Sequence, residues 1–332
     1  MIPVLAGLDI GGTKCAVVLG LEVDSGIELI AKKSFPTPDT PEKALELMMD
    51  ELEKLMFDHE ELKLIAIGIS CGGPLDSKRG LILSPPNLPH WNSIDCLTPL
   101  EHRFKVPVAV QNDANACALA EWKWGAGKGT NNMIFLTFGT GMGAGFILDG
   151  RLYSGTNDMA GEVGHIRLES DGPIGYGKSG SFEGFCSGGG IARLSQTMVK
   201  EWLAQGKSTS ICASSEEIES LTAKTVGEAA QTGDELAREI YKVVGQKLGR
   251  GLALLVDMLN PEKIVIGSIY LRQEELLKPF VIEELQKEAL PYSLEVCNVV
   301  PSGLKENVGD LASLSVARYA LDIKGKEASA CC

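Results

Sequence analysis

This sequence has little basic charge for its size. It contains 31 Lys and Arg residues against 44 Asp and Glu residues, which gives a net charge of −13. A nucleic-acid surface needs a basic patch, and the chain has no basic cluster longer than Lys32-Lys33. Nucleic acid is therefore not an expected partner.

Signals for membrane insertion and export are also missing. No apolar run approaches the roughly 18 residues of a membrane span, and residues 1–4 begin no signal peptide. The nine cysteines are scattered, odd in number and mostly set in apolar segments. We therefore expect buried, reduced thiols in a cytoplasmic protein without a membrane partner. The terminal Cys331-Cys332 pair leaves open a lipidation signal or an unstructured end.

Two common catalytic signatures are absent. The chain contains neither the G-x-x-x-x-G-K-[ST] of a P-loop nor the H-E-x-x-H of a metalloprotease. Residues 139–144 read GTGMGA and match G-x-G-x-x-A, but a dinucleotide-binding turn must open a helix. Residues 145–148 continue instead as a strand, which disfavours a dinucleotide site.

Glycine, in contrast, is abundant and clustered. It supplies 38 of 332 residues, above the usual share of about 7%. Residues 8–19 read LDIGGTKCAVVL, and residues 135–148 read FLTFGTGMGAGFIL. In each, a strand enters small residues and a second strand leaves them, towards a turn at Gly20 or Asp149-Gly150. Since glycine lets backbone amides approach a ligand closely, the two hairpins predict a polyphosphate site in a nucleotide-using enzyme.

The remaining pattern predicts a mixed α/β sheet with helices in each half. Strands are expected over 27–35, 64–69, 106–110 and 263–267, and helices over 42–59, 113–124, 191–205, 234–258 and 313–321. Because strand–glycines–strand recurs, we expect a duplicated fold with a cleft between its halves. The expected domains are a smaller one over 1–114 plus about 306–325, and a larger one over 115–305.

Polar residues at strand ends are candidates for chemistry. Asp9 precedes the first glycines and could hold Mg²⁺, directly or through water, while Thr13 meets phosphate oxygens; capping a turn is the alternative. Asp113 lies between a strand and a helix, where it could cap the helix or accept a proton from a substrate hydroxyl.

A second group of polar residues lies near the later glycines. Glu162 and His165 are three residues apart, and Glu183 follows in a glycine-rich stretch over 172–190. Carboxylates and an imidazole that converge on one site suit a polyhydroxylated ligand. A satisfied polar residue is the alternative for His165.

Together these segments resemble the ROK family of sugar kinases and repressors, within the actin-like (ribonuclease H-like) ATPase fold. The resemblance runs from about Leu5 to Leu321. It depends on five motifs in order: LDIGGTK at 8–14, SCGGP at 70–74, NDAN at 112–115, GTGMG at 139–143 and GEVGH at 161–165. It implies duplicated actin-like domains flanking a cleft, in a cytoplasmic homodimer.

The resemblance also implies an activity, the ATP-dependent phosphorylation of a hexose at its 6-hydroxyl, with Mg²⁺. Asp113 is implied as the general base. The implied sugar ligands are Gly72, Gly73, Asn112, Asp113, Glu162, His165 and Glu183. The implied nucleotide ligands are Asp9, which holds Mg²⁺ directly or through water, and Gly11, Gly12, Thr13, Lys14, Gly139, Thr140, Gly141, Gly143 and Gly267. Glu183 belongs to neither phosphate motif, so its replacement by Gln is expected to raise the KM for the sugar far more than the KM for ATP.

The chain departs from the family at two places. The resemblance implies that residues 260–268 border the adenosine pocket, where the family often has a second glycine after Gly267 and this chain has Ser268. It also commonly holds a structural zinc with the histidine of E-x-G-H and three cysteines, whose places are taken here by Ile174, Tyr176 and Ser181. No structural zinc is expected, since His165 alone cannot hold one, and packing through Ile174 and Tyr176 is expected in its place.

The kinase is favoured over three alternatives. Family repressors carry an N-terminal helix-turn-helix, which is not expected here because the first phosphate motif begins at residue 8. A non-catalytic sugar sensor keeps the same site, and an Hsp70-like ATPase would need a peptide-binding domain after residue 321. Glucose is the first choice, but N-acetylhexosamine, fructose and allose kinases share these ligands. The loop over 83–91 and the segment 172–186 are expected to select the sugar; the sequence leaves open another phosphoryl donor and the oligomeric state.

Overall fold

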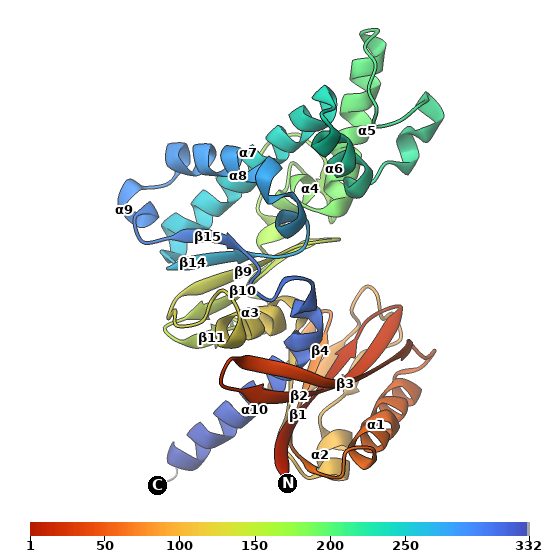
Figure 1. The fold of residues 1–332 in the computed structure, drawn as a ribbon, viewed down its shortest axis with the longest axis vertical. Helices are drawn as coiled ribbons and strands as arrows, with labels where there is room; N and C mark the ends of the chain where they lie inside the picture. The colour runs from red at the N-terminus through yellow and green to blue at the C-terminus, as the bar shows by residue number, and fades with distance from the viewer. Residues whose placement is uncertain (331–332) are drawn as a thin grey trace. The chain divides into compact units, whose positions relative to one another are not determined.

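Two five-stranded sheets with the same strand order organise the chain. The computed structural model describes residues 1–330, with side chains as far as residue 325, so Cys331-Cys332 lie outside the described residues. The sheet orders are β3-β2-β1-β4-β8 and β11-β10-β9-β14-β15 (Figure 1). In each sheet, the last two strands run parallel to the strand that opens the glycine hairpin. The predicted duplication of a mixed α/β fold is confirmed.

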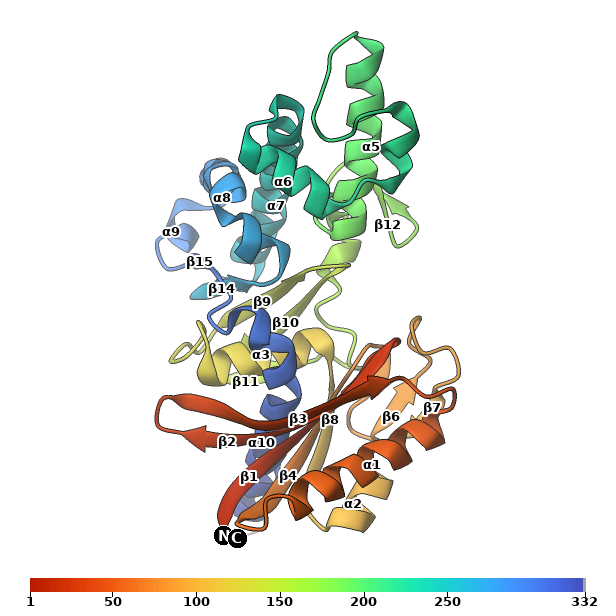
Figure 2. The same cartoon turned by 45° about the vertical axis from the view of Figure 1, so that its right-hand side comes forward.

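The first sheet is covered by helices on both faces (Figure 2). Its strands are β1 (Ile2–Ile10), β2 (Lys14–Val23), β3 (Gly26–Pro36), β4 (Leu62–Cys71) and β8 (Val108–Asn112). Its helices are α1 (Pro41–Phe57), α2 (Thr98–Phe104), α3 (Asp113–Trp124) and α10 (Val308–Ala330). A small sheet accompanies them, with β5 (Leu75–Asp76), β6 (Leu81–Leu83) and β7 (Asn92–Asp95).

Glycine explains how closely α10 lies on the first sheet. A Cβ built on Gly68 of β4 would lie 2.1 Å from the carbonyl oxygen of Ser313 and 2.1 Å from the amide of Ala317. The predicted turn at Gly20 is wrong, because β2 continues to Val23; a Cβ on Gly20 would instead lie 2.4 Å from Leu314 Cδ1 of α10. The predicted turn at Asp149-Gly150 is confirmed, with φ of +50° and +68°.

The second half carries a longer set of helices. Its strands are β9 (Met133–Phe138), β10 (Met142–Leu148), β11 (Arg151–Tyr153), β14 (Lys263–Ile266) and β15 (Asn298–Pro301), with a hairpin of β12 (Ile174–Gly175) and β13 (Lys178–Ser179). Its helices are α4 (Phe182–Phe185), α5 (Gly188–Ala204), α6 (Ala223–Thr232), α7 (Glu235–Leu259), α8 (Ile269–Glu288) and α9 (Pro291–Leu294). The described residues also contain the 3₁₀ turns η1 (Val163–His165), η2 (Ser215–Ser220) and η3 (Lys305–Asn307).

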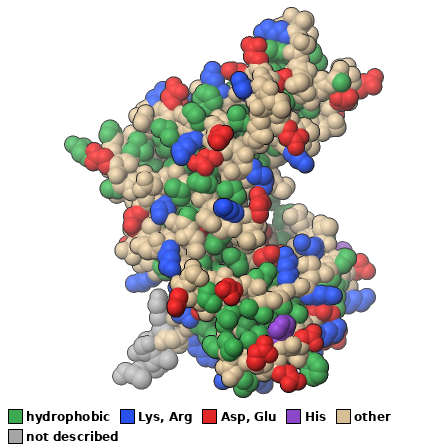
Figure 3. Space-filling view, viewed as in Figure 1, with side chains coloured by type: hydrophobic (Ala, Val, Ile, Leu, Met, Phe, Trp, Pro, Cys, Tyr) green, Lys and Arg blue, Asp and Glu red, His purple; other side chains and the backbone are tan. Residues whose placement is uncertain are grey.

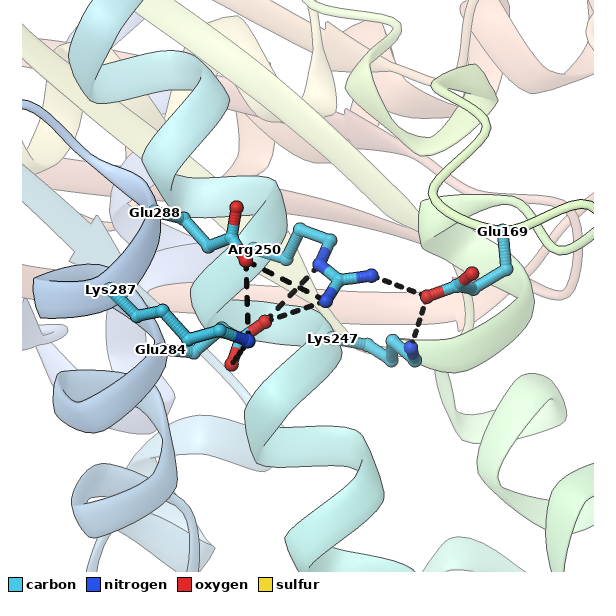
Figure 4. A network of polar contacts seen from close by, with 6 residues as sticks. All are labelled: Glu169, Lys247, Arg250, Glu284, Lys287 and Glu288. Carbon is cyan, nitrogen blue, oxygen red and sulfur yellow. Dashed lines mark hydrogen bonds and ion pairs between the residues drawn. The ribbon is translucent and has the colours of Figure 1, made fainter.

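Small residues and charges join α7 to α8. A Cβ on Gly245 or on Gly249 of α7 would lie 2.8 Å from atoms of α8. Arg250 Nη2 donates to the buried Glu284 of α8 at 2.9 Å, and Arg250 and Lys247 both contact Glu169 (Figure 4). The buried carboxylate of Glu284 is therefore paired with the guanidinium of Arg250, as a buried charge requires.

The chain forms two compact units. One contains residues 1–131, 145–160 and those from 306 onward, and the other contains 132–144 and 161–305. The predicted domain bounds, 1–114 plus about 306–325 and 115–305, remain a proposal about which segments fold together. Over residues 1–330 we find no helix with the length and apolarity of a membrane span. Lys and Arg are interspersed with Asp and Glu on the face shown in Figure 3.

Candidate active site

The first glycine hairpin joins β1 to β2 by a tight turn. The Gly11 amide donates to the carbonyl oxygen of Lys14 at 3.1 Å. A Cβ on Gly12 would lie 2.5 Å from the carbonyl oxygen of Asn87, so only glycine fits there. Gly12, Thr13 and Lys14 are exposed. The turn therefore presents backbone amides, a hydroxyl and an ammonium group to a ligand, as a phosphate site requires.

Asp9 is a half-buried carboxyl near the end of β1. Burial raises its pKa to about 7, with further increases from the charges of Asp113 and Asp310 that exceed the opposing effect of Lys14 and Lys32. A nearby cation would favour its ionised form.

The surroundings of Asp9 suit a magnesium ion better than a metal with many protein ligands. Over the described part of the chain, no cluster of three or more His, Cys, Asp or Glu is arranged to hold a metal. Mg²⁺ commonly takes only one or two protein carboxylates, together with water and substrate phosphates. Asp9 beside the phosphate-type turn fits this arrangement.

Asp113 is the first residue of α3 and is an exposed residue. The surrounding protein raises its pKa by desolvation, and a hydrogen bond from Ser70 Oγ at 3.3 Å partly opposes this. Asn112, not Asp113, caps the helix, since its Oδ1 accepts from the amide of Asn115 at 2.8 Å. The alternative of Asp113 as a helix cap is therefore wrong, and its carboxylate can accept a proton.

The Gly72-Gly73 loop lies beside this carboxylate. A Cβ on Gly72 would lie 4.0 Å from Asp113 Oδ2, and one on Gly73 would lie 4.0 Å from the Cβ of Asn112. The cap uses Oδ1 of Asn112, so its amide nitrogen remains able to donate to a ligand. The structure brings together Gly72, Gly73, Asn112 and Asp113 of the predicted sugar site.

Sequence reasoning missed the support beneath this junction. Asn115 is fully buried, and its Nδ2 donates to Oε1 of the buried Gln111 at 3.1 Å. This bond joins the end of β8 to the first turn of α3. The sequence signal for this bond is the side-chain amide of Asn115, two residues after Asp113.

The second glycine hairpin has a similar turn. The Gly139 amide donates to the carbonyl oxygen of Gly141 at 3.1 Å, and the Gly188 amide donates to the carbonyl oxygen of Gly139 at 2.7 Å. Gly188 begins α5, whose first turn is three glycines capped by Ser187. The start of a helix is the positive end of its dipole, which favours a phosphate nearby.

A cavity of about 740 Å³ adjoins this turn. Gly139 and Thr140 lie at its edge, with Gly188 and Gly189 of α5, and the rest of its lining comes from the segment before α6, from α6 and α7, and from the start of α8. Its size and the adjoining amides fit a nucleotide. No prediction from the sequence covered α6 or α8, although Thr222 and Thr225 form a capping box at the start of α6.

Ser268, not Gly267, lines this cavity. Gly267 is buried, and its amide donates to the carbonyl oxygen of Leu136 at 3.0 Å. Ser268 has φ +55° and ψ −111°, a conformation that favours glycine. This explains why a second glycine suits the position and why serine is strained there.

Glu183 contacts the second hairpin directly. Its Oε2 accepts from the amide of Met142 at 3.1 Å, and a Cβ on Gly141 would lie 2.9 Å from the same oxygen. The premise that Glu183 is not involved with either phosphate motif is therefore wrong, while the expected larger effect on the sugar KM than on the ATP KM stays a prediction. Its carboxylate helps to hold the turn that contains Gly141 and Gly143.

His165 lies in the same unit as Glu183. It ends η1, which follows the exposed Glu162. A Cβ on Gly164 would lie 3.1 Å from the Cβ of Glu183, so the η1 segment lies against α4. Glu162 and His165 therefore lie on a segment that packs against the helix carrying Glu183.

The three positions at which the resemblance led us to expect cysteines, 174, 176 and 181, have separate environments. Ser181 is buried and caps α4, accepting from the amide of Gly184 at 3.1 Å. Tyr176 contacts the ring of His165 edge-on. Ile174 is 54% exposed, so the expected packing through Ile174 is wrong.

Comparison with known proteins agrees with these features. The ROK family model matches residues 5–318. A glucokinase of Halalkalibacterium halodurans is 35% identical over 292 residues, 86% of each chain. A xylose repressor of Caldicellulosiruptor bescii is 30% identical over 269 residues, which cover 80% of this chain and 65% of the repressor.

A solved structure extends the likeness to the fold. The ROK family glucokinase of Streptomyces griseus, in complex with glucose and AMPPNP, is 28% identical, with a TM-score of 0.71 over 95% of this chain and 99% of that one. The fold is thus the actin-like ATPase fold of ROK kinases. With a family match over almost its whole length, the chain belongs to the ROK family.

Proposed function

We propose that this chain is an ATP-dependent hexose kinase that phosphorylates the 6-hydroxyl of glucose. The observation that carries the proposal is the place of the Asp113 carboxylate beside the Gly72-Gly73 loop, where desolvation raises its pKa. A base whose pKa rises towards the working pH accepts a proton more effectively. The glucokinases among the relatives support the choice of glucose.

In the proposed reaction, Asp113 accepts the proton of the 6-hydroxyl. The sugar oxygen then forms a bond to the γ-phosphorus of ATP, and the bond from that phosphorus to the β–γ bridging oxygen breaks, which releases ADP. Asn112, Glu162, His165 and Glu183 hold the other hydroxyls, because paired acceptors and donors suit a polyhydroxylated ring. Such positioning is the main requirement of phosphoryl transfer.

The nucleotide is proposed to bind in the cavity of the second unit. Gly139 and Thr140 at its edge support this, as does the glycine start of α5. On the first hairpin, Gly11, Gly12, Thr13 and Lys14 contact phosphate oxygens in the proposal. Mg²⁺, held by Asp9 directly or through water, supplies charge neutralisation for the phosphates. No structural zinc is included, since Ile174, Tyr176 and Ser181 cannot replace three thiolates.

The test is ADP release with ATP, Mg²⁺ and a panel of glucose, N-acetylglucosamine, N-acetylmannosamine, fructose and allose. We expect the highest kcat/KM with glucose and an N-acetylhexosamine second. If calorimetry detects glucose binding but no sugar causes ADP release, the result would support a non-catalytic sugar sensor instead. This alternative is tested because repressors are among the relatives. A homodimer in the cytoplasm remains part of the proposal, to be checked by light scattering and fractionation.

A further inference from the structure

Both sides of the β12–β13 turn contact His165. The ring of Tyr176 lies 5.0 Å from the ring of His165, centre to centre, at an interplanar angle of 76°. Lys178 Nζ donates to the carbonyl oxygen of His165 at 2.6 Å. One turn therefore holds both the side chain and the backbone of the same residue.

The turn places Tyr176 in an unusual conformation. Gly175 pairs with Lys178, and the two residues between them, Tyr176 and Gly177, have φ of +44° and +77°. Two positive values are typical of a type I′ turn, whose first position favours asparagine or glycine. A bulky residue there is disfavoured. Tyr176 is also 70% exposed, so burial of its ring in a core does not explain it.

The hairpin rests on the helix that carries Glu183. A Cβ on Gly175 would lie 2.5 Å from the amide of Gly184, and Ser181 Oγ donates to the carbonyl oxygen of Gly175 at 3.4 Å. Before the hairpin in the chain, Glu169 contacts Lys247 and Arg250 of α7 and so fixes the segment that leads into it (Figure 4). A fixed base lets the turn hold His165 in one place.

We propose that Tyr176 is a positioning residue of the sugar site, which fixes the ring of His165 in the orientation that binds a hexose hydroxyl. This inference rests on the proposed function, because it takes His165 as a sugar ligand. In this proposal Tyr176, which is exposed and has a strained backbone, affects sugar affinity but not nucleotide binding.

The test compares Tyr176→Asn, Tyr176→Gly and Tyr176→Phe. Asn and Gly suit a positive φ and remove the ring, while Phe keeps the ring. We expect Asn and Gly to raise the hexose KM by about three- to tenfold, the value of an edge-to-face pair, with kcat and the ATP KM unchanged. Phe should keep the wild-type hexose KM.

Thermal stability separates positioning from a purely structural role. Asn and Gly relieve the backbone strain, so the melting temperature should stay equal or rise while the hexose KM increases. Tyr292→Asn, at a residue that is 83% exposed on α9, is the control and should change neither value. An unchanged hexose KM in Tyr176→Asn and Tyr176→Gly would overturn the proposal.

A double-mutant cycle with His165→Gln tests whether Tyr176 acts through His165. In that background Tyr176→Asn should have no further effect on hexose affinity. Fully additive effects would refute the proposal. If the protein binds hexose without turnover, the same cycle is measured on the hexose dissociation constant. Failure of the proposed kinase activity can then be distinguished from failure of the proposed role of Tyr176.

A spectroscopic readout is independent of activity. The chain has four histidines, so the ring-proton resonances of His165 can be assigned with His165→Gln. They should shift in Tyr176→Asn and return to the wild-type position in Tyr176→Phe. Resonances that do not move in Tyr176→Asn would contradict the ring contact and the proposal with it.

Discussion

The two glycine hairpins stand at the same place in two sheets of the same order, but their surroundings differ. Asp9 lies two residues before Gly11, and Thr137 lies two residues before Gly139. Thr137 Oγ1 accepts from the amide of Gly143 at 2.9 Å and adds no charge. Asp9 instead titrates near neutral pH, with a pKa raised to about 7 by burial and neighbouring carboxylates.

The strand ends differ in the same way. β8 leads into Asn112 and Asp113, whereas β15 leads into Pro301 and Ser302. The first half therefore gathers acids where its strands end, while the second half adds helices that line a cavity. One topology carries two kinds of chemistry, because function depends on side chains at strand ends rather than on the fold.

The acids of the first half should give the strongest effect on activity. Asp113→Asn should lower kcat by about 10²–10⁴-fold, as loss of a general base does, while glucose still binds by calorimetry. The control is Asp158→Asn, at a buried acid that accepts hydrogen bonds from Ser77, which should keep kcat. Near-normal turnover in Asp113→Asn would remove the proposed base.

The raised pKa of Asp9 predicts a pH dependence of stability. Its carboxyl binds a proton more tightly in the folded protein than in the unfolded chain, so stability falls as pH rises from about 4 to about 7. Without Mg²⁺, Asp9→Asn should raise the free energy of unfolding at pH 8 by roughly 1–4 kcal/mol, at about 1.4 kcal/mol per pKa unit.

Urea unfolding at pH 4 and at pH 8 measures this effect. The two proteins should differ least at pH 4, where the folded Asp9 carboxyl is protonated, and most at pH 8. The matched change in the second half, Thr137→Val, should give no pH-dependent difference. Parallel pH curves for wild type and Asp9→Asn would contradict the electrostatic contrast between the hairpins.

Glu183 tests whether the second hairpin is linked to the sugar site. Glu183→Gln replaces a charged acceptor of the Met142 amide by a neutral one, which weakens that hydrogen bond. We expect the glucose KM to rise about tenfold and the ATP KM about two- to threefold, since a charge-assisted bond is roughly twice as strong as a neutral one. Steady-state kinetics with each substrate varied decides this. An ATP KM equal to wild type would mean that the contact does not hold the phosphate turn.

The strained residue of the second half should give the weakest effect. Ser268→Gly should raise stability by about 1 kcal/mol, because glycine adopts a positive φ without the strain of a side chain. Ser34→Gly, in the exposed strand β3, is the control and should lower stability by about 0.5–1 kcal/mol. Thermal denaturation of both variants provides the measurement, and a loss of stability in Ser268→Gly would count against strain at this position.

Much of the contrast between the two glycine hairpins could be predicted from local sequence. The hairpins, the start of α3 at Asp113 and the strand end at Asp9 follow from apolar runs that stop at small or polar residues. The role of Gly20 did not follow, because the residue that requires glycine there, Leu314, is distant in sequence. The helices that line the cavity were missed as well, since their relation to the glycines appears only in the folded unit.

The contact of Glu183 shows the same limit. Forty-one residues separate it from Met142, and no local pattern relates a short helix to a distant turn. Asn112 and Asp113 are neighbours, yet which of them caps α3 depends on backbone geometry. Motifs therefore indicate which residues matter, while tertiary contacts decide what each one does.

Activation of the 6-hydroxyl of a hexose by Asp113 can be tested on the product itself. The measurement is ³¹P NMR of the product formed from glucose and MgATP by wild type and by Asp113→Asn at equal concentrations. We expect glucose 6-phosphate from the wild type, and from the variant only at a rate lower by about 10²-fold or more. Glucose 1-phosphate, or equal rates of 6-phosphate formation by both proteins, would contradict the role of Asp113 as the base.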